Sequence, residues 1–225
     1  MSRSTTKQEG SSHPCQVWYE WSGKNGNLKN YDKATESNIE TKAPFKFMLL
    51  DIFSVIKGWS EINSSGIYSN ETKTTGKTPF VVRAYKGGTL VEGLYKDIKD
   101  KIKAVGGTYN KNLYISTIID GETKICSLVL KGASLSAWVT FSDENKGELY
   151  NKAIVISGSV TGKKGAVTFQ TPKFELVEAT EAEKEVANGL DVILQQYLNS
   201  KEVETPGVIE NTDMPVNQLY DWGEF

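Results

Sequence analysis

Cations and aromatic rings alternate through one part of the chain, between Lys57 and Lys86. A protein that binds an unpaired nucleic-acid strand without sequence preference needs cations for the phosphates and ring faces for the bases. The pattern therefore indicates a nucleic-acid-binding surface. The candidate binding residues in this part of the chain are Lys57, Trp59, Tyr68, Lys73, Lys77, Arg83, Tyr85 and Lys86.

The segment from Phe80 to Lys86 has the composition of a β-strand. Side chains alternate between the two faces of a strand, so Arg83 and Tyr85 are predicted to point the same way. On an outward face they would offer a guanidinium beside a ring, about two residues apart. The alternative is that Tyr85 covers the core while Arg83 is only solvated.

Two further places carry candidate binding residues. Tyr109, Lys111 and Tyr114 lie around the start of a later predicted strand. Lys163 and Lys164 lie in a glycine-flanked basic turn, where ammonium groups and backbone amides could hold phosphates. The alternative reading of this turn is a plain hairpin tip, and Trp138, among apolar neighbours, is expected to pack in the core.

The motifs that would indicate catalysis are incomplete. The single histidine, His13, lies in a polar N-terminal segment, which excludes a histidine-based dyad or zinc site in the core. A phosphate-binding loop ending at Thr75 to Thr78 would need glycine where Glu71 stands. Glu122 to Lys124 resembles the end of a nuclease motif, but a solvated hairpin end explains it better. We therefore expect no enzyme, no metal site and no cofactor.

The C-terminal segment combines negative charge with aromatic rings. After Lys201 there are six acidic residues and no basic ones, and two prolines and two glycines disfavour regular structure. Rings at the end of such a segment suit an apolar pocket on a partner, with basic groups around it. The predicted partner-binding residues are Tyr220, Asp221, Trp222, Glu224 and Phe225. The alternative is a tip that folds back onto its own domain.

Composition and charge fit this division. The chain of 225 residues has a formal net charge of −2, so the part before the tail carries +4. Hydrophobic residues make up 38%, below the usual globular share, which places part of the chain outside any core. Cys15 and Cys126 are too few for a disulfide framework and favour a reducing compartment. No apolar run reaches the length of a membrane span, and no signal peptide precedes the domain, so a soluble intracellular protein is expected.

Strand patterns dominate the elements that must position these residues. Apolar and β-branched runs bounded by Gly, Asn or Asp predict strands, and Asp120-Gly121 predicts a tight hairpin. Apolar residues three or four apart predict one helix from Val91 to Val105 and a second from Glu181 to Leu198. Ser134 to Trp138 fits a short helix or a strand. The predicted strands are 17–21, 44–55, 80–85, 113–119, 124–130, 153–160 and 166–176.

The order of these elements predicts a mainly β protein: an OB-like Greek-key barrel with one inserted helix, a C-terminal helix and disordered termini. A β-sandwich with an inserted helix is the alternative. The predicted organisation is a disordered arm over 1–14, an OB-like domain over 15–178, a helix over 179–199 and a flexible acidic tail over 200–225.

Several segments in sequence order resemble a family of single-stranded DNA-binding proteins from tailed phages. They are Phe45 to Asp51, Gly58-Trp59 with Gly66 to Glu71, Gly93 to Lys99, Leu130 to Trp138 and Gly162 to Gly165. The tail also resembles the acidic, aromatic-ended tails of phage and bacterial single-strand binders. The resemblance implies replication and recombination roles in the cytoplasm of a bacterial host, and a tail that recruits replication enzymes.

The leading hypothesis is therefore a protein that coats and protects single-stranded DNA, with no turnover. Its expected partners are single-stranded DNA and, through the tail, phage or host replication and recombination enzymes. No membrane partner is expected, and self-association is left open. The alternative is a non-enzymatic structural or protein-interaction module, in which every ring is a core or partner contact.

Overall fold

A computed structural model describes residues 12–204 and 209–210 of the chain, with side chains as far as Ser200. Most of the predicted N-terminal arm and most of the acidic tail, including its tip from Tyr220 to Phe225, lie outside the described residues. The predictions made for those segments stay predictions. In the part described, strands predominate, so the protein is mainly β as expected.

Twelve strands and three helices occur within the described residues. Their order and bounds are β1 Val17–Ser22, β2 Asn27–Asp32, β3 Ser37–Thr41, β4 Phe45–Ser60, β5 Ser65–Glu71, β6 Phe80–Ala84, β7 Gly88–Gly93, α1 Tyr95–Ala104, β8 Gly107–Ile119, β9 Glu122–Lys131, α2 Gly132–Glu144, β10 Ala153–Lys164, β11 Val167–Val177, α3 Glu181–Glu204 and β12 Ile209–Glu210.

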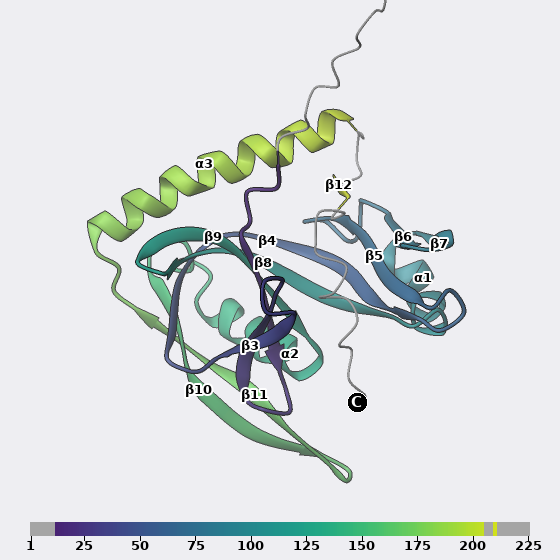
Figure 1. Ribbon diagram of the computed structural model, residues 1–225, viewed down its shortest axis with the longest axis horizontal. Helices are drawn as coiled ribbons and strands as arrows, with labels where there is room; N and C mark the ends of the chain where they lie inside the picture. Colours follow the sequence, from purple (N-terminus) through teal and green to yellow (C-terminus); the bar gives the residue numbers. More distant parts are fainter. Residues whose placement is uncertain (1–11, 205–208, 211–225) are drawn as a thin grey trace, which may run out of the picture.

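The strands form one open mixed sheet in the order β3-β2-β1-β9-β8-β4-β5-β6-β7 (Figure 1). β10 pairs with the start of β4 and with β11, and β1 runs parallel to β9. β11 returns to the turn after β1, where the Gln170 N–H donates to the Gly23 carbonyl at 2.7 Å. The Trp21 indole N–H donates to the Gln170 carbonyl at 2.8 Å. No ladder joins the strands there, so the sheet is not closed within the described residues and the OB-like barrel is not confirmed.

Three apolar clusters pack on this sheet, two on one face and one on the other. α2 and the β10–β11 pair cover one face around Leu113, Ile115 and Trp138. α1 covers the same face further along, around Ile56 and Ile102. α3 crosses one end of the opposite face and packs on residues that alternate with the first set, among them Met48, Leu50, Phe53 and Tyr114. The rest of that opposite face carries polar residues.

The helices differ from the sequence expectation at their ends. The first begins at Tyr95 rather than Val91, because Val91 pairs with Val82 in the β6–β7 hairpin. Strand pairing buries this valine as effectively as a helix face would. The segment after Lys131 forms the helix α2, so the strand alternative for Ser134 to Trp138 is wrong. Trp138 is buried, as predicted.

The strands expected from their apolar runs are all present, and the Asp120-Gly121 turn has positive φ at both residues. β2, β3, β5, β7 and β12 were not predicted. β2 and β3 are rich in Asn, Lys and Glu, which strands contain less often. Pairing with their neighbours holds them in the sheet. None of the helices in the described part of the chain has the length and apolar character to cross a bilayer.

Candidate nucleic-acid interface

One face of the sheet gathers cations and rings from strands that lie far apart in sequence. Lys57 and Trp59 alternate along β4 with Ile56, which packs under α1, so they point to the opposite face. Directly paired residues of neighbouring strands point to the same face of a sheet. The register of the strands therefore shows which residues of the other strands share the face of Lys57 and Trp59. We call this surface the polar face; it comprises Glu20, Lys29, Tyr31, Lys57, Trp59, Tyr68, Arg83, Tyr85, Thr108, Asn110 and Lys131.

Arg83 and Tyr85 lie together on the polar face, as the strand alternation predicts. Arg83 pairs directly with Tyr68 of β5. The rings of Tyr68 and Tyr85 are 4.6 Å apart between centroids, with 35° between their planes. All three side chains are partly exposed. Because the core under α1 is filled by Phe80, Val82 and Ala84, which alternate with them, the reading in which Tyr85 covers that core is wrong.

Trp59 is positioned by an unusually close backbone approach. Its carbonyl oxygen lies 2.0 Å from the place where a Cβ of Gly106 would be, and Gly106 has φ of +90°. The Trp59 N–H also donates to the Gly106 carbonyl at 3.3 Å. Only glycine fits at Gly106, because any side chain would displace the Trp59 backbone. Gly106 therefore fixes the backbone of β4 at Trp59, close to the end of the strand.

Lys57 is buried, although the sequence predicts a solvent-exposed lysine that binds phosphate. It is only 2% exposed, and burial lowers its pKa from 10.5 to about 8, against the raising effect of Glu20 and Glu71. The nearby carboxylates therefore keep the ammonium charged at neutral pH. Lys57 therefore adds positive potential from beneath the polar face. It is not an exposed, flexible side chain that could contact a phosphate directly.

A hydrogen-bonded network lies beside Lys57. The fully buried Glu71 accepts from Asn112 Nδ2 at 2.6 Å and from the Tyr114 hydroxyl at 2.9 Å. The Ser127 hydroxyl donates to Asn112 Oδ1. Burial raises the pKa of Glu71 and, more strongly, that of Tyr114. The network fixes the strands β5, β8 and β9 against one another below the polar face.

Two amide oxygens of this region have no hydrogen-bond partner. Asn110 Oδ1 and Asn27 Oδ1 are both buried and unsatisfied in the structure, although their Nδ2 groups donate to the Thr108 carbonyl and to Glu40. Asn110 lies on the polar face, and Asn27 alternates with Leu28 and shares the side of Lys29. A buried acceptor without a donor is costly. Because both oxygens are buried, neither is open to a ligand in this structure.

Tyr109 and Lys111 lie on the opposite face. The Tyr109 hydroxyl is 2.7 Å from Ser54 Oγ, and Lys111 Nζ donates to the same oxygen at 2.8 Å. The Tyr109 ring packs against Tyr95 of α1, with centroids 4.7 Å apart. Tyr114 is fully buried in the Glu71 network. The predicted grouping of these three residues with Arg83 and Tyr85 is therefore not formed.

The remaining predicted cations are spread around the edge of the sheet. Lys73 pairs with Asp51 at 2.6 Å and lies 5.1 Å from the centroid of the Phe53 ring, near α3. Lys77 is exposed in the loop before β6, and Lys86 is exposed in the β6–β7 turn. Lys163 and Lys164 are exposed near the end of the β10–β11 pair. None of these belongs to the polar face as defined by register.

Sequence reasoning missed two cations and one ring of the polar face: Lys29, Lys131 and Tyr31. Lys29 and Tyr31 lie on β2, which is not among the predicted strands. Lys131 ends β9 and pairs with Asn110. Strand alternation from Ser127 and Val129 could have placed Lys131 on this side, but nothing in the sequence indicates that β9 lies beside β1. That adjacency joins the two halves of the polar face.

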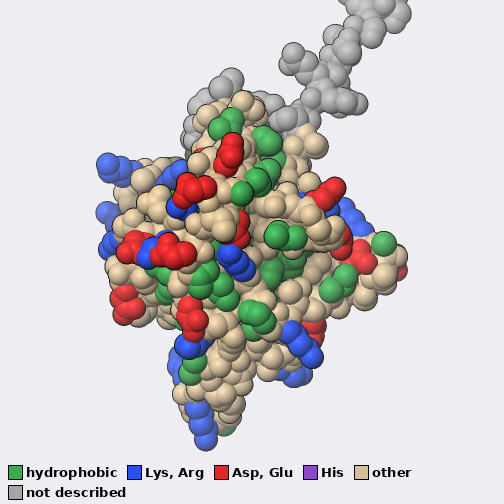
Figure 2. All heavy atoms as spheres, turned by 90° about the vertical axis from the view of Figure 1, so that its left-hand side faces the viewer, with side chains coloured by type: hydrophobic (Ala, Val, Ile, Leu, Met, Phe, Trp, Pro, Cys, Tyr) green, Lys and Arg blue, Asp and Glu red, His purple; other side chains and the backbone are tan. Residues whose placement is uncertain are grey.

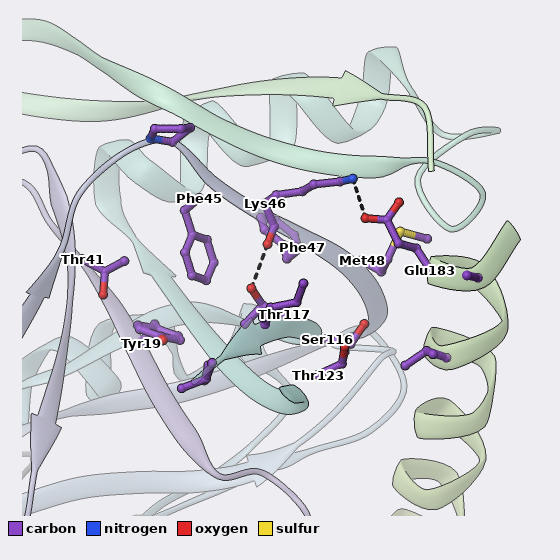
Figure 3. A pocket seen from close by; sticks show the side chains of 15 residues that line it. Tyr19, Thr41, Phe45, Lys46, Phe47, Met48, Ser116, Thr117, Thr123 and Glu183 are labelled. Carbon is purple, nitrogen blue, oxygen red and sulfur yellow. Dashed lines mark hydrogen bonds and ion pairs between the residues drawn. The ribbon is translucent and has the colours of Figure 1, made fainter. Parts of the chain in front are cut away.

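A cavity of about 670 Å³ lies at the other ends of β4 and β8, beside the start of α3 (Figure 3). Its walls are mainly the rings of Tyr19, Phe45 and Phe47 with aliphatic side chains. Lys46 pairs with Glu183 at its edge at 2.5 Å. Its only charged lining residues, Lys46 and Glu183, are paired with each other, so we assign no chemistry to the cavity and place the candidate site on the polar face.

Comparison of the chain with protein-family models, with curated proteins and with solved structures gives no match. Among the described residues, no three His, Cys, Asp or Glu side chains are grouped so that they could hold a metal ion. The predicted partner-binding residues Tyr220, Asp221, Trp222, Glu224 and Phe225 lie outside the described residues.

Proposed function

We propose that this protein binds single-stranded DNA without sequence preference, along the polar face, and that it performs no chemistry on the DNA. The observation that carries the proposal is the register of the sheet, which brings Lys29, Lys131 and Arg83 onto one surface with the rings of Trp59, Tyr68 and Tyr85. Cations along a strand's phosphates and rings against its bases are the two contacts that such binding needs.

The chemistry of the polar face also fits bases rather than a peptide. Rings accept any base on their faces, because every base has a π-face. The protein-interaction alternative would require a partner that presents negative charges and planar groups together, which single-stranded DNA does along its whole length.

A titration with oligo-dT, followed by tryptophan fluorescence at low and high salt, tests the proposal. Wild-type protein should be quenched on binding, and its affinity should fall steeply as salt increases. Tyr85→Ala should weaken binding about five-fold to a hundred-fold, since one base–ring stack is lost. Thermal melting of the variant shows whether the fold is retained.

Tyr150→Ala is the matched control, because Tyr150 is an exposed tyrosine that lies outside the polar face. Its affinity should equal that of the wild type. If Tyr85→Ala binds as tightly as Tyr150→Ala, or if oligo-dT does not bind at low salt, the polar face is not a DNA-binding surface.

We further propose that the protein acts in the cytoplasm of a bacterial host, where it coats replication and recombination intermediates and offers its tail to replication enzymes. The acidic, aromatic-ended sequence after Lys201 supports a recruiting role. Deletion of residues 202–225 should abolish binding to the cognate polymerase or helicase in a pull-down. Unchanged binding to these enzymes would contradict the recruiting role.

A further inference from the structure

A two-stranded ribbon extends from the body of the protein. β10 pairs with β4 only from Ile154 to Ile156, and beyond that point it pairs with β11 alone as far as Lys164 (Figure 1). In the view of Figure 2, basic side chains gather at the lower end of this projection. The sequence from Gly158 to Pro172 contains two lysines and no acidic residue. The ribbon therefore presents uncompensated positive charge.

The two faces of the ribbon differ in character. Gln170, Pro172 and Phe174 alternate along β11 and face the body, where Phe174 packs in the core around Trp138. Phe169 points the other way and is partly exposed. On the same outer face Val160 is 54% exposed and Val167 is 47% exposed, so this side of the ribbon is open to solvent at those positions.

Phe169 lies across its strand partner, Gly162. A Cβ built on Gly162 would be 2.5 Å from Cε2 of the ring. The glycine is needed here for space rather than for its φ. The ring is thereby held in one orientation on a solvent-facing surface, and Lys164 lies on the same face two residues beyond Gly162. A fixed ring beside a cation repeats the arrangement of Tyr85 and Arg83.

The root of the ribbon adjoins the polar face. A Cβ on Gly26, in the turn before β2, would lie 2.7 Å from Ser159 Oγ. The Gly23 carbonyl accepts the Gln170 N–H at 2.7 Å. β2 leaves this turn carrying Asn27 and then Lys29 of the polar face. The base of the ribbon therefore lies beside the turn from which β2 starts, at one edge of the polar face.

We propose that the ribbon is a second contact for the same single-stranded DNA, in which Phe169 stacks on a base while Lys163 and Lys164 bind phosphates. This inference rests on the proposed function and extends its binding surface. The absence of acidic residues favours a polyanion as the occupant over a second copy of the ribbon, whose lysines would repel these.

The length of the DNA separates the two contacts. An oligo-dT of about eight nucleotides fits one binding surface, whereas one of about thirty nucleotides can cover both. Phe169→Ala should weaken binding of the long oligonucleotide about five-fold to a hundred-fold and leave the short one unchanged. Phe169→Trp should retain the affinity, and its added fluorescence should be quenched by the long oligonucleotide only.

Two further variants distinguish stacking from general apolar contact. Gly162→Ala should weaken long-oligonucleotide binding as Phe169→Ala does, because the new methyl group displaces the ring. Val160→Ala is the matched control, since it removes apolar surface from the same face without touching the ring contact. Thermal melting checks that each variant is folded.

Equal affinity of wild type and Phe169→Ala for the long oligonucleotide would overturn the inference. An equal loss of affinity for the long oligonucleotide in Val160→Ala would also overturn it. So would a Phe169→Ala variant whose only defect is reduced self-association, measured by light scattering without DNA. In each case Tyr85→Ala can still weaken the short oligonucleotide, which leaves the proposed function standing. If the short oligonucleotide does not bind to the wild type, the proposed function fails on its own account.

Discussion

Lys57 shows how a buried residue can contribute charge to the polar face without solvent contact. Its ammonium is buried, and the charges of Glu20 and Glu71 raise its pKa and so offset part of the effect of burial. The folded protein releases the Lys57 proton at a pKa of about 8, whereas the unfolded chain releases it near the ordinary value of 10.5. A side chain of this kind contributes charge to the face and also makes stability depend on pH.

The sign of this dependence can be tested. Above pH 8 the unfolded chain binds more protons at Lys57 than the folded protein does, so this residue makes the free energy of unfolding rise with pH. Relative to Lys57→Met, the wild type should gain roughly 1 kcal/mol per pH unit above about pH 8. Urea unfolding at about pH 7, 8 and 9 measures the difference.

The comparison with Lys57→Met is needed because other buried groups act in the opposite direction. Burial raises the pKa of the Cys15 and Cys126 thiols, the latter to about 12, so both bind protons more tightly in the folded state. Their contribution falls as pH rises, and it is present in both proteins. Identical pH slopes for the wild type and Lys57→Met would refute the assignment.

Tyr114 supports the polar face from below through a bond to a buried carboxyl group. Tyr114→Phe removes the 2.9 Å hydrogen bond to Glu71 and leaves that acceptor with one fewer donor. The variant should lose about 2 kcal/mol in urea unfolding, as is typical for bonds to charged groups. Tyr109→Phe is the control: its 2.7 Å partner is the neutral Ser54 hydroxyl, so the loss should be about 1 kcal/mol. Equal losses would contradict a charged Glu71.

The helix α3 packs against the rest of the protein through one of its faces only. Leu194 is fully buried in the cluster with Met48 and Tyr114, while its neighbour Ile193 is 49% exposed. Leu194→Ala should therefore destabilise the protein by about 2 to 5 kcal/mol, through lost burial and a new cavity. Ile193→Ala should change stability by less than about 0.5 kcal/mol. Urea unfolding of the pair tests whether α3 belongs to the folded core.

The polar face is assembled from both halves of the chain, so the proposed DNA binding depends on the tertiary structure of the whole molecule. The cations Lys29, Arg83 and Lys131 come from β2, β6 and β9. If each contacts a phosphate, Lys131→Ala and Lys29→Ala should each lower the slope of log affinity against log salt by about 0.7. Lys184→Ala, on the exposed side of α3 and paired with Glu181, should leave the slope unchanged. Salt titrations of oligo-dT binding measure all three.

The sequence by itself determined the mainly β character, the Asp120-Gly121 hairpin, the C-terminal helix and the shared direction of Arg83 and Tyr85. These follow from local rules: the period of side chains along a strand or helix and the φ angles that a turn requires. The same rules gave the wrong start for α1, because Val91 is buried equally well by a helix or by pairing with Val82.

Only the tertiary structure decided which strands are neighbours. Polar strands such as β2 and β3 are held by pairing that local propensity does not reveal, and the parallel contact of β1 with β9 brings Lys29 and Lys131 onto one face. The tertiary structure also places Tyr109 and Lys111 on the face opposite the polar face, and it buries Lys57 and Tyr114. Spacing along the chain gives the direction of a side chain within its strand, but register and strand order depend on contacts between distant segments.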